Sequence, residues 1–590
     1  MSCVLAGFIK KGKRDINFVN CSDNRDLFNR LEGDYFEYKN VVILIDGYIS
    51  EFEDREFDSL DTLSRVGELF LKYGEDVFKK IDGSYILIIY DKERENLYVC
   101  RDRTGIKSLY CFENEEFFLF STKINRLYSF TSIDKRINFD SLALYLQYGY
   151  ISAPYSVYEN VHKLKAGCYV KYDLKSGLIE ERNYWNIIDY YLEPKVQKSK
   201  EEILQTSEEL LKRSVENLLK ISSSTPSAFL SGGYDSSIIA LFLSKLSSQK
   251  IDTYTVGFFE SGYDEAPFAK EIASFIGSNH FELYMTSKDA RELLPKLGEF
   301  YDEPFGDKAS LPTMMLLKKA SLKRDSIFSG EGGDEVFATA GDLYFYKRFL
   351  KIPYFFRKSL SKAMKVVPFS LIEKIDFIYN FPTRYSKWQK LFSSENVIDF
   401  IRFKEQVLTN RELRGIFISE TKSKQPYREL GEFDLSDHLN QMLAVYLKIY
   451  MSNDELIKVS KAASGFGVEL FEPFLNRRLM EFLARVDSSI KHKNREEKYI
   501  LKQIIYKHMP RELLERPKRG FNVPLEIWFR GELRDMIEEY LSFERIKREG
   551  IFDPDRVEKF KNGFLEGRRE YTKRVWLLLA FEIWYEKNGS

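Results

Sequence analysis

Residues 229–237 read Phe-Leu-Ser-Gly-Gly-Tyr-Asp-Ser-Ser and lead into an apolar run over residues 238–243. This order predicts a strand, a short polar loop and a helix. The Ser-Gly-Gly at 231–233 lets backbone N–H groups approach an anion closely, and the start of the helix adds the positive end of its dipole. Asp235 would hold a magnesium ion beside that anion. The stretch therefore predicts a cradle for nucleotide phosphates, with an ordinary tight turn as the alternative.

A second glycine-rich stretch follows roughly a hundred residues later, where residues 327–337 read Ile-Phe-Ser-Gly-Glu-Gly-Gly-Asp-Glu-Val-Phe. Ligands of an open parallel sheet bind beyond the carboxyl ends of its strands, so both loops are expected to converge on one nucleotide. Asp235 and Asp334 would then share a magnesium ion, and Glu331 becomes a candidate base. Taken singly, each of these acids could instead be a helix-start residue favoured by the dipole.

The rest of the chain indicates an α/β protein with two unlike halves. Short β-rich runs at residues 41–45, 85–90 and 97–100 predict an N-terminal antiparallel sandwich with flanking helices. Ser199 and Glu202 form a capping box, after which β-rich segments near 227, 253, 281 and 326 alternate with helical ones, as a doubly wound parallel sheet requires. Beyond about residue 340 the pattern is helical. We expect an N-terminal domain over residues 1–192, a linker over 193–202, a nucleotide-binding core over 203–340 and a mainly helical remainder over 341–590.

With both loops in place, the chain resembles the asparagine synthetase family, which combines a glutaminase domain of the Ntn-hydrolase type with an ATP pyrophosphatase domain. The resemblance extends through most of residues 200–530 in the family's order. It is carried by Thr255-Val256-Gly257-Phe258, Tyr263-Asp264-Glu265, Asp302-Glu303-Pro304-Phe305, Pro473-Phe474-Leu475, Lys498-Tyr499-Ile500-Leu501 and Lys518-Arg519-Gly520-Phe521-Asn522. It implies that a carboxylate attacks the α-phosphorus of ATP, pyrophosphate leaves, and a nitrogen nucleophile displaces AMP.

The resemblance also assigns roles to particular residues. Lys498 would contact the nucleotide phosphates and the intermediate, and Glu331 would accept a proton from the attacking ammonia. Asp235 and Asp334 would bind Mg²⁺, with ATP as the other cofactor. The candidate ATP and pyrophosphate ligands are Leu230, Ser231, Gly232, Gly233, Asp235, Ser236, Ser237, Val256, Gly257, Ser329 and Gly330. The candidate substrate pocket comprises Gly332, Asp264, Glu469 and Phe471.

The N-terminal domain departs from the family pattern where glutaminase chemistry occurs. That mechanism needs an N-terminal cysteine, whereas this chain begins Met-Ser-Cys and aligns Cys3 with the nucleophile. The family's Asn-Gly-Glu becomes Asp46-Gly47-Tyr48, and the carboxylate expected for the glutamine amine is displaced to Asp61. We therefore expect a glutaminase-like domain that is retained for structure but inactive.

Three interpretations of function remain. The preferred one is an asparagine-type synthetase that uses ammonia, because Glu331 matches the ammonia-using members. The alternative is an enzyme like the β-lactam synthetases or lasso-peptide cyclases, in which an amine of the substrate attacks, or an amide ligase on another carboxylate. Phe471 favours this alternative, since it replaces an arginine that would bind a carboxylate. A scaffold without activity conflicts with the retained acids.

Composition sets the remaining expectations. The chain has 90 acidic and 90 basic residues, so its charge does not indicate a nucleic-acid partner. Five scattered cysteines and the lack of a signal or membrane-spanning stretch are typical of the cytoplasm, and we expect no membrane partner. A homodimer is left open. Residues 344–358 interleave aromatic and basic side chains, which favours amphipathic packing over a grip on peptide, RNA or lipid.

Overall fold

The structure is a computed structural model of the chain. It describes residues 5–10, 16–20, 35–129, 134–339, 341–367, 372, 381–419, 421, 427, 430, 433, 435–493, 496–515 and 523–589.

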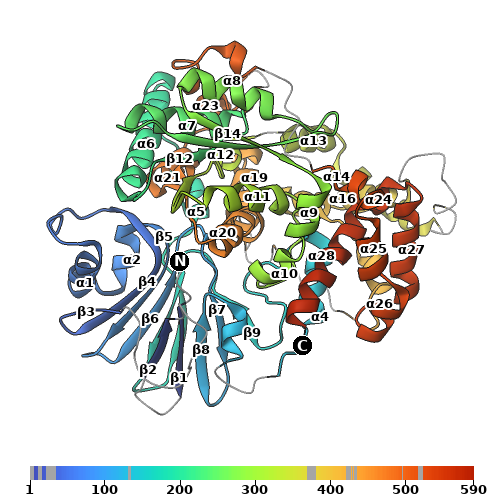
Figure 1. The fold of residues 1–590 in the computed structure, drawn as a ribbon, viewed down its shortest axis with the longest axis horizontal. Coiled ribbons are helices and arrows are strands. Elements are labelled where there is room, and N and C mark those ends of the chain that lie inside the picture. The colour runs from blue at the N-terminus through green and yellow to red at the C-terminus, as the bar shows by residue number, and fades with distance from the viewer. Residues whose placement is uncertain are drawn as a thin grey trace.

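Two antiparallel sheets form the N-terminal domain, drawn in blue in Figure 1. One has the order β2-β1-β8-β7-β9 and the other β11-β10-β6-β5-β4-β3. Residues 81–91 supply a long apolar strand that is buried along most of its length, as a strand between two covered faces must be. The strands are β1 Leu5–Lys10, β2 Ile16–Asn20, β3 Phe36–Tyr38, β4 Val41–Phe52, β5 Ile81–Asp91, β6 Asn96–Arg101, β7 Tyr110–Glu113, β8 Phe117–Ser121, β9 Val161–Lys163, β10 Cys168–Asp173 and β11 Ile179–Asn183. The helices are α1 Thr62–Tyr73, η1 Gly74–Asp76, α2 Val77–Lys80, α3 Ile124–Leu127, α4 Phe139–Tyr148 and α5 Ile187–Leu192.

The second half is built on a parallel sheet with the order β14-β13-β12-β15-β16. The chain moves outward in one direction from β12 to β14 and then returns to the other side of β12, so the crevice between β12 and β15 is the topological switch point. The strands are β12 Ser227–Phe229, β13 Asp252–Phe258, β14 Asn279–Met285, β15 Ser326–Phe328 and β16 Glu469–Phe471. The four predicted β-rich segments are all confirmed, whereas β16 was not anticipated as a strand.

Helices cover both faces of this sheet, as Figure 1 shows for α6, α7 and α11. The capping box at Ser199 and Glu202 is present, and it starts α6 at Lys200. The predicted linker over 193–202 is therefore too long, since residues 200–202 already form the first turn of that helix. The helices are α6 Lys200–Ile221, α7 Tyr234–Leu246, α8 Ala266–Ile276, α9 Ser287–Leu293, α10 Lys296–Phe300, α11 Ser310–Ala320 and α12 Gly333–Phe337.

The remainder is helical apart from β16, as expected. Its helices are α13 Gly341–Leu350, α14 Tyr354–Val366, α16 Phe381–Phe392, α17 Val397–Glu405, α18 Asn410–Arg414, α19 His438–Val445, η3 Tyr446–Glu455, α20 Leu456–Gly465, η4 Pro473–Leu475, α21 Arg477–Ala484, α22 Ser488–Lys491, α23 Tyr499–Ile505, η5 Arg511–Leu513, α24 Leu525–Arg530, α25 Arg534–Tyr540, α26 Phe543–Glu549, α27 Pro554–Leu565, η6 Arg569–Tyr571 and α28 Thr572–Asn588. Among the described residues, no helix combines the length and apolar character that crossing a bilayer requires.

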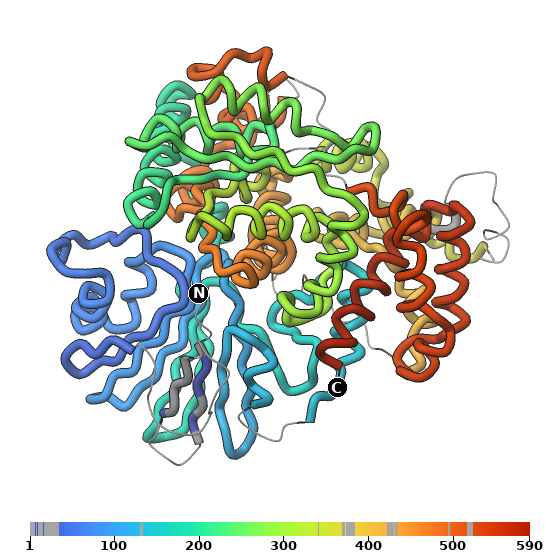
Figure 2. The backbone as a smooth tube through the Cα atoms, viewed as in Figure 1, coloured from blue at the N-terminus to red at the C-terminus, as the bar shows by residue number. Residues whose placement is uncertain are grey.

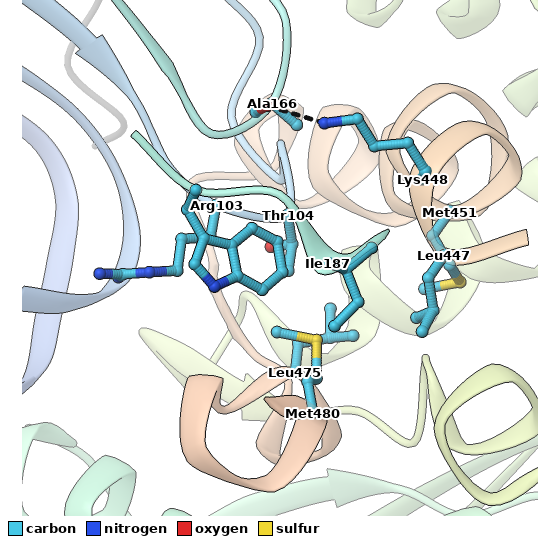
Figure 3. A pocket seen from close by; sticks show the side chains of 10 residues that line it. Arg103, Thr104, Ala166, Ile187, Leu447, Lys448, Met451, Leu475 and Met480 are labelled. Atoms are coloured by element: carbon cyan, nitrogen blue, oxygen red, sulfur yellow. Dashed lines mark hydrogen bonds between the residues drawn. The ribbon is translucent and has the colours of Figure 1, made fainter. Parts of the chain in front are cut away.

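The two halves share one apolar core, which joins residues of β4 and β5 to residues of α6, α7 and α21. Figure 2 shows the N-terminal domain directly beneath the half of the chain that is built on the parallel sheet. Figure 3 shows a void at this contact, where Ile187 faces Leu447 and Met451 of η3. Trp185 also lines this void. The volume of the void is about 10 Å³, roughly the space that one water molecule needs, so the contact is close to fully packed. The ammonium of Lys448 also donates to the Ala166 carbonyl across it.

Candidate functional site

The two glycine-rich loops lie side by side at the carboxyl edge of the parallel sheet. Their strands are direct neighbours, with Ala228 opposite Phe328. A Cβ atom added to Gly330 would lie 3.0 Å from the backbone nitrogen of Ser236, and one added to Gly333 would overlap the Asp235 carboxyl. Gly330 is needed because the two loops pack backbone against backbone there, and Gly333 leaves room for the Asp235 side chain. The predicted convergence of the two loops is present in the structure.

The first loop is shaped as an anion cradle. Gly232 adopts the left-handed region at φ +77°, which glycine reaches without strain. The Ser236 hydroxyl accepts from the Ser231 backbone N–H at 3.1 Å, and the Ser231 hydroxyl accepts from the Gly233 N–H at 3.3 Å. Gly233 is the N-cap of α7, so the positive end of that helix points to the loop.

Lys498 joins the two loops. Its ammonium lies 2.5 Å from an oxygen of Asp235 and 2.6 Å from an oxygen of Asp334. Burial lowers the pKa of Lys498, but the two carboxylates more than offset this, so its pKa is raised and the side chain is a fixed cation. Its backbone has φ +52°, a conformation costly for a lysine, and its N–H donates to Ala338. Strain of this kind persists where the surroundings hold the residue in one position.

The two aspartates meet a magnesium ion's usual requirement for one or two carboxylates, with water and phosphate oxygens filling the other positions. They lie within reach of one cation, since both contact the same ammonium. Within the described ranges no group of three or more His, Cys, Asp and Glu side chains is arranged around a metal position. Two carboxylates are enough for a magnesium ion that takes its other ligands from water and phosphate.

Glu331 belongs to a charged cluster opposite the cradle. Lys458 of α20 lies 4.0 Å from Glu331 and 3.4 Å from Asp307, and it also pairs with Glu455 at the end of η3. The Tyr450 hydroxyl donates to Glu455 at 2.5 Å. Burial raises the pKa of Glu331 to about 8, an effect that Lys458 opposes and Glu455 reinforces. Glu331 is thus a carboxyl that titrates near neutral pH beside a fixed cation.

Sequence reasoning missed Lys458, Glu455 and Asp307. A lysine three residues after a glutamate on a helix is a common surface pair, so the spacing alone gave no sign of function. One local signal was available only from the fold: η3 is a π-helical stretch, and such stretches are frequent at functional sites.

The two loops, Lys498 and the charged cluster all line one cavity of about 1330 Å³. The predicted residues on its wall are Leu230, Ser231, Gly232, Gly233, Asp235, Ser236, Val256, Ser329, Gly330, Glu331, Gly332, Asp334 and Lys498.

Five predicted residues do not line that cavity. Ser237 is buried within α7, and Gly257 packs against the Asp264 carboxyl, which itself accepts from the Ala266 N–H. Glu469 and Phe471 lie on one face of β16, as residues two apart in a strand do, and that face is turned toward the N-terminal domain. Of the four residues predicted to form a substrate pocket, Gly332 lines the cavity and Asp264, Glu469 and Phe471 do not.

Two of the residues that depart from the glutaminase pattern lie at the contact with the second half of the chain. Lys107 lies between Asp46, at 3.5 Å, and Glu469, at 3.1 Å. The ring of Tyr48 packs edge-on against that of Phe471, with centroids 5.0 Å apart. Asp61 serves as the N-cap of α1, accepting from two backbone N–H groups. Cys3 lies outside the described residues.

Two glycine-rich loops at a topological switch point, a lysine that bridges their aspartates and a glutamate of raised pKa thus line one cavity. The model of the family described as asparagine synthase matches residues 206–586, and that of a glutamine amidotransferase domain matches residues 52–185. The chain belongs to the asparagine synthase family. The amidotransferase match begins beyond Cys3 and Asp46-Gly47-Tyr48.

Relatives support this membership. A protein of Methanocaldococcus jannaschii, named putative glutamine-hydrolysing asparagine synthetase 2, is 32% identical over 52% of this chain and 60% of its own length. Glutamine-hydrolysing asparagine synthetase 1 of Bacillus subtilis is 25% identical over 88% of this chain and 79% of its own. The chain thus spans less than two thirds of the archaeal relative. An ammonia-dependent NAD synthetase structure from Campylobacter jejuni overlaps 24% of this chain and 60% of its own at 14% identity, with a TM-score of 0.18, too low to carry an argument.

Proposed function

We propose that the protein is an ATP-dependent amide synthetase that releases AMP and pyrophosphate, with a reaction of the asparagine synthetase type. A carboxylate oxygen of the substrate attacks the α-phosphorus of ATP, and pyrophosphate leaves. Ammonia then attacks the acyl carbon of the adenylate, and AMP leaves. The observation that carries the proposal is the Lys498 ammonium held between Asp235 and Asp334, where the two loops meet.

The phosphate loop and Lys498 would act in the first step. Departing pyrophosphate concentrates negative charge, and preorganised N–H donors and a fixed cation stabilise such charge without reorganising. Asp235 and Asp334 would hold Mg²⁺, which when bound supplies further positive charge to the phosphate oxygens. Lys498 would exchange its contacts with these aspartates for contacts with phosphate as the substrate enters.

Glu331 would act in the second step. The nitrogen that attacks the adenylate must lose a proton, and a carboxylate at the cavity wall can accept it directly or through water. With a pKa of about 8, Glu331 is poised near the working pH, where a base is most effective. Lys458 would stabilise the ionised form and hold the side chain in place.

We further propose that the N-terminal domain does not supply the nitrogen. Tyr48 and Asp46, which replace the family's glutamate and asparagine, are engaged with Phe471 and Lys107. The Asp61 carboxylate caps a helix. Ammonia would therefore reach the cavity from solution or from a partner. A cytoplasmic location and a homodimer stay predictions.

The size of the cavity favours a second candidate function, the formation of a cyclic amide. Its volume of about 1330 Å³ exceeds the roughly 300–1000 Å³ that ordinary ligand pockets occupy. A larger acid that carries its own amine would use this space, and intramolecular attack would then give a cyclic amide, as in the β-lactam synthetases.

Exchange of labelled pyrophosphate into ATP tests the function across a panel of carboxylates. Exchange with aspartate, followed by ammonium-dependent amide formation, supports the first candidate. Exchange only with a larger amine-bearing acid selects the cyclase. The absence of exchange with every acid in the presence of Mg²⁺ would contradict both.

A further inference from the structure

Helix α14 has an inner face that is fixed to the rest of the protein. The buried Arg357 guanidinium donates to the Ser394 carbonyl at 3.0 Å. The Ser361 hydroxyl, one turn later, donates to the Gln389 carbonyl at 2.7 Å, and the Tyr385 hydroxyl donates to the Met364 carbonyl at 2.9 Å. Residues 357, 361 and 364 share one helical face, so α14 is anchored along its length against α16 and the turn that follows it.

The outer face of the same helix is apolar. Phe355 is 74% exposed, Phe356 63% and Val366 81%. Leu360 lies one turn after Phe356 and is also exposed, as are Ile352 and Val367 at the two ends. The two phenylalanine rings contact each other, yet no described part of the chain covers them. The expectation that the aromatic residues of this stretch pack inward is therefore wrong for Phe355 and Phe356.

A stripe of lysines runs beside the apolar stripe. Lys358, Lys362 and Lys365 follow at intervals of four and three residues, so they share a face of α14, and all three are exposed. Over residues 343–367 the sequence has seven Lys or Arg and no Asp or Glu, although the chain as a whole is neutral. The Lys358 ammonium lies 3.7 Å from an oxygen of Glu395. The segment is thus a local concentration of positive charge.

We propose that α14 docks the protein onto an anionic membrane surface. A helix with a basic stripe and an apolar stripe rich in phenylalanine lies in the bilayer interface, where the rings enter the acyl boundary and lysines contact the lipid head groups. The separation of the stripes favours lipid over RNA, because RNA needs aromatic and basic side chains interleaved along one groove. The anchored inner face holds the apolar stripe outward, so α14 cannot bury it by turning.

The experiment is co-sedimentation of the full chain with vesicles. One set contains phosphatidylcholine with phosphatidylglycerol, and the other contains phosphatidylcholine alone. We expect binding to the first set, weakened by added salt, and little binding to the second. Equal binding to both sets, or none to either, would overturn the proposal.

Two variants separate the stripes. Phe355→Ser with Phe356→Ser, and Lys358→Glu with Lys362→Glu and Lys365→Glu, should each lower the partition coefficient by about tenfold or more. The matched control is Leu322→Ser with Lys319→Glu and Lys323→Glu, because Leu322 is also 74% exposed and both lysines are exposed. The control should bind within about twofold of the parent. All three should keep the parent's melting temperature, since the changed side chains are exposed.

Other partners of the exposed face of α14 would give different results in these experiments. An equal loss of binding in the control variant would show that general surface charge, rather than α14, governs the interaction. If the phenylalanine variant instead converts a dimer into a monomer by light scattering and vesicles do not bind the parent, the face is an interface between copies and the lipid proposal fails. A shift of the protein's electrophoretic mobility with single-stranded RNA, together with no binding to vesicles, would also overturn the lipid proposal.

Discussion

The carboxyl edge of the parallel sheet and the facing edge of the N-terminal domain treat their charged residues in opposite ways. At the sheet edge Asp235, Asp334 and Lys498 line a large cavity. At the N-terminal edge Lys107 pairs with Asp46 and with Glu469 of the other half. We propose that similar groups serve chemistry in the first region and domain contact in the second. The difference predicts that substitutions in the first region lower activity, whereas those in the second lower stability.

Lys498→Ala should have the largest effect. It removes a cation that contacts both loop aspartates, and loss of such a preorganised charge costs about a thousandfold in rate. Both pyrophosphate exchange and amide formation should fall, with little loss of helical content by circular dichroism. Lys502→Ala is the control, because Lys502 also lines the cavity but pairs with Glu496. Equal rates of amide formation for Lys498→Ala and Lys502→Ala would contradict the special role of Lys498 at the sheet edge.

Glu331→Gln should have the next largest effect, and it should slow the second step of the reaction much more than the first. Amide formation is expected to fall about a hundredfold, as for loss of a general base, whereas pyrophosphate exchange should stay within a few fold of the parent. A parallel loss of exchange would place Glu331 in adenylation instead.

The pH dependence of amide formation offers a sharper view of Glu331. Its raised pKa of about 8 means that the carboxyl is mainly protonated below that pH and becomes a base above it. The rate should therefore rise with pH through about 8 in the parent and lose this rise in Glu331→Gln. Hydroxylamine as the nucleophile, which is already uncharged at neutral pH, removes the titration of ammonium from the measurement.

Lys107→Met tests the other edge. It leaves Asp46 and Glu469 facing each other without their cation, and we expect the free energy of unfolding to fall by about 2 kcal/mol, less than for a fully buried pair because Glu469 is partly exposed. Denaturant titration measures this loss. The specific activity of the folded fraction with ammonium should stay within a few fold, and a loss of activity without a loss of stability would contradict the assigned role.

Cys3→Ala should have the smallest effect. Ammonium-dependent amide formation is expected to be unchanged within about twofold, because the proposed reaction does not use the N-terminal thiol. A glutamine-dependent rate in the parent that this substitution abolishes would restore a catalytic role to the N-terminal domain.

The sequence was sufficient to predict the features that depend on interactions between residues near one another in the chain. The glycines of the two loops, the apolar strands before them and the Ser199 capping box each act within a few residues, so their positions were predictable. The meeting of Asp235 and Asp334 also followed, because parallel strands align their carboxyl ends. The orientation of β16 was not predictable, since the face on which Glu469 and Phe471 lie depends on the register of a three-residue edge strand against β15. Lys458 and Glu455 were not predicted as site residues for a related reason. Only the packing of η3 and α20 turns their side chains toward the cavity.

The π-helical stretch η3 has a consequence for the role of the N-terminal domain. On one side its Lys448 ammonium donates to the Ala166 carbonyl of the N-terminal domain, and on the other it presents Tyr450 and Glu455 to the cavity. Removal of residues 1–192 would leave this wall of the cavity without its backing. The N-terminal domain would thus act as a buttress for the cavity whether or not it hydrolyses glutamine.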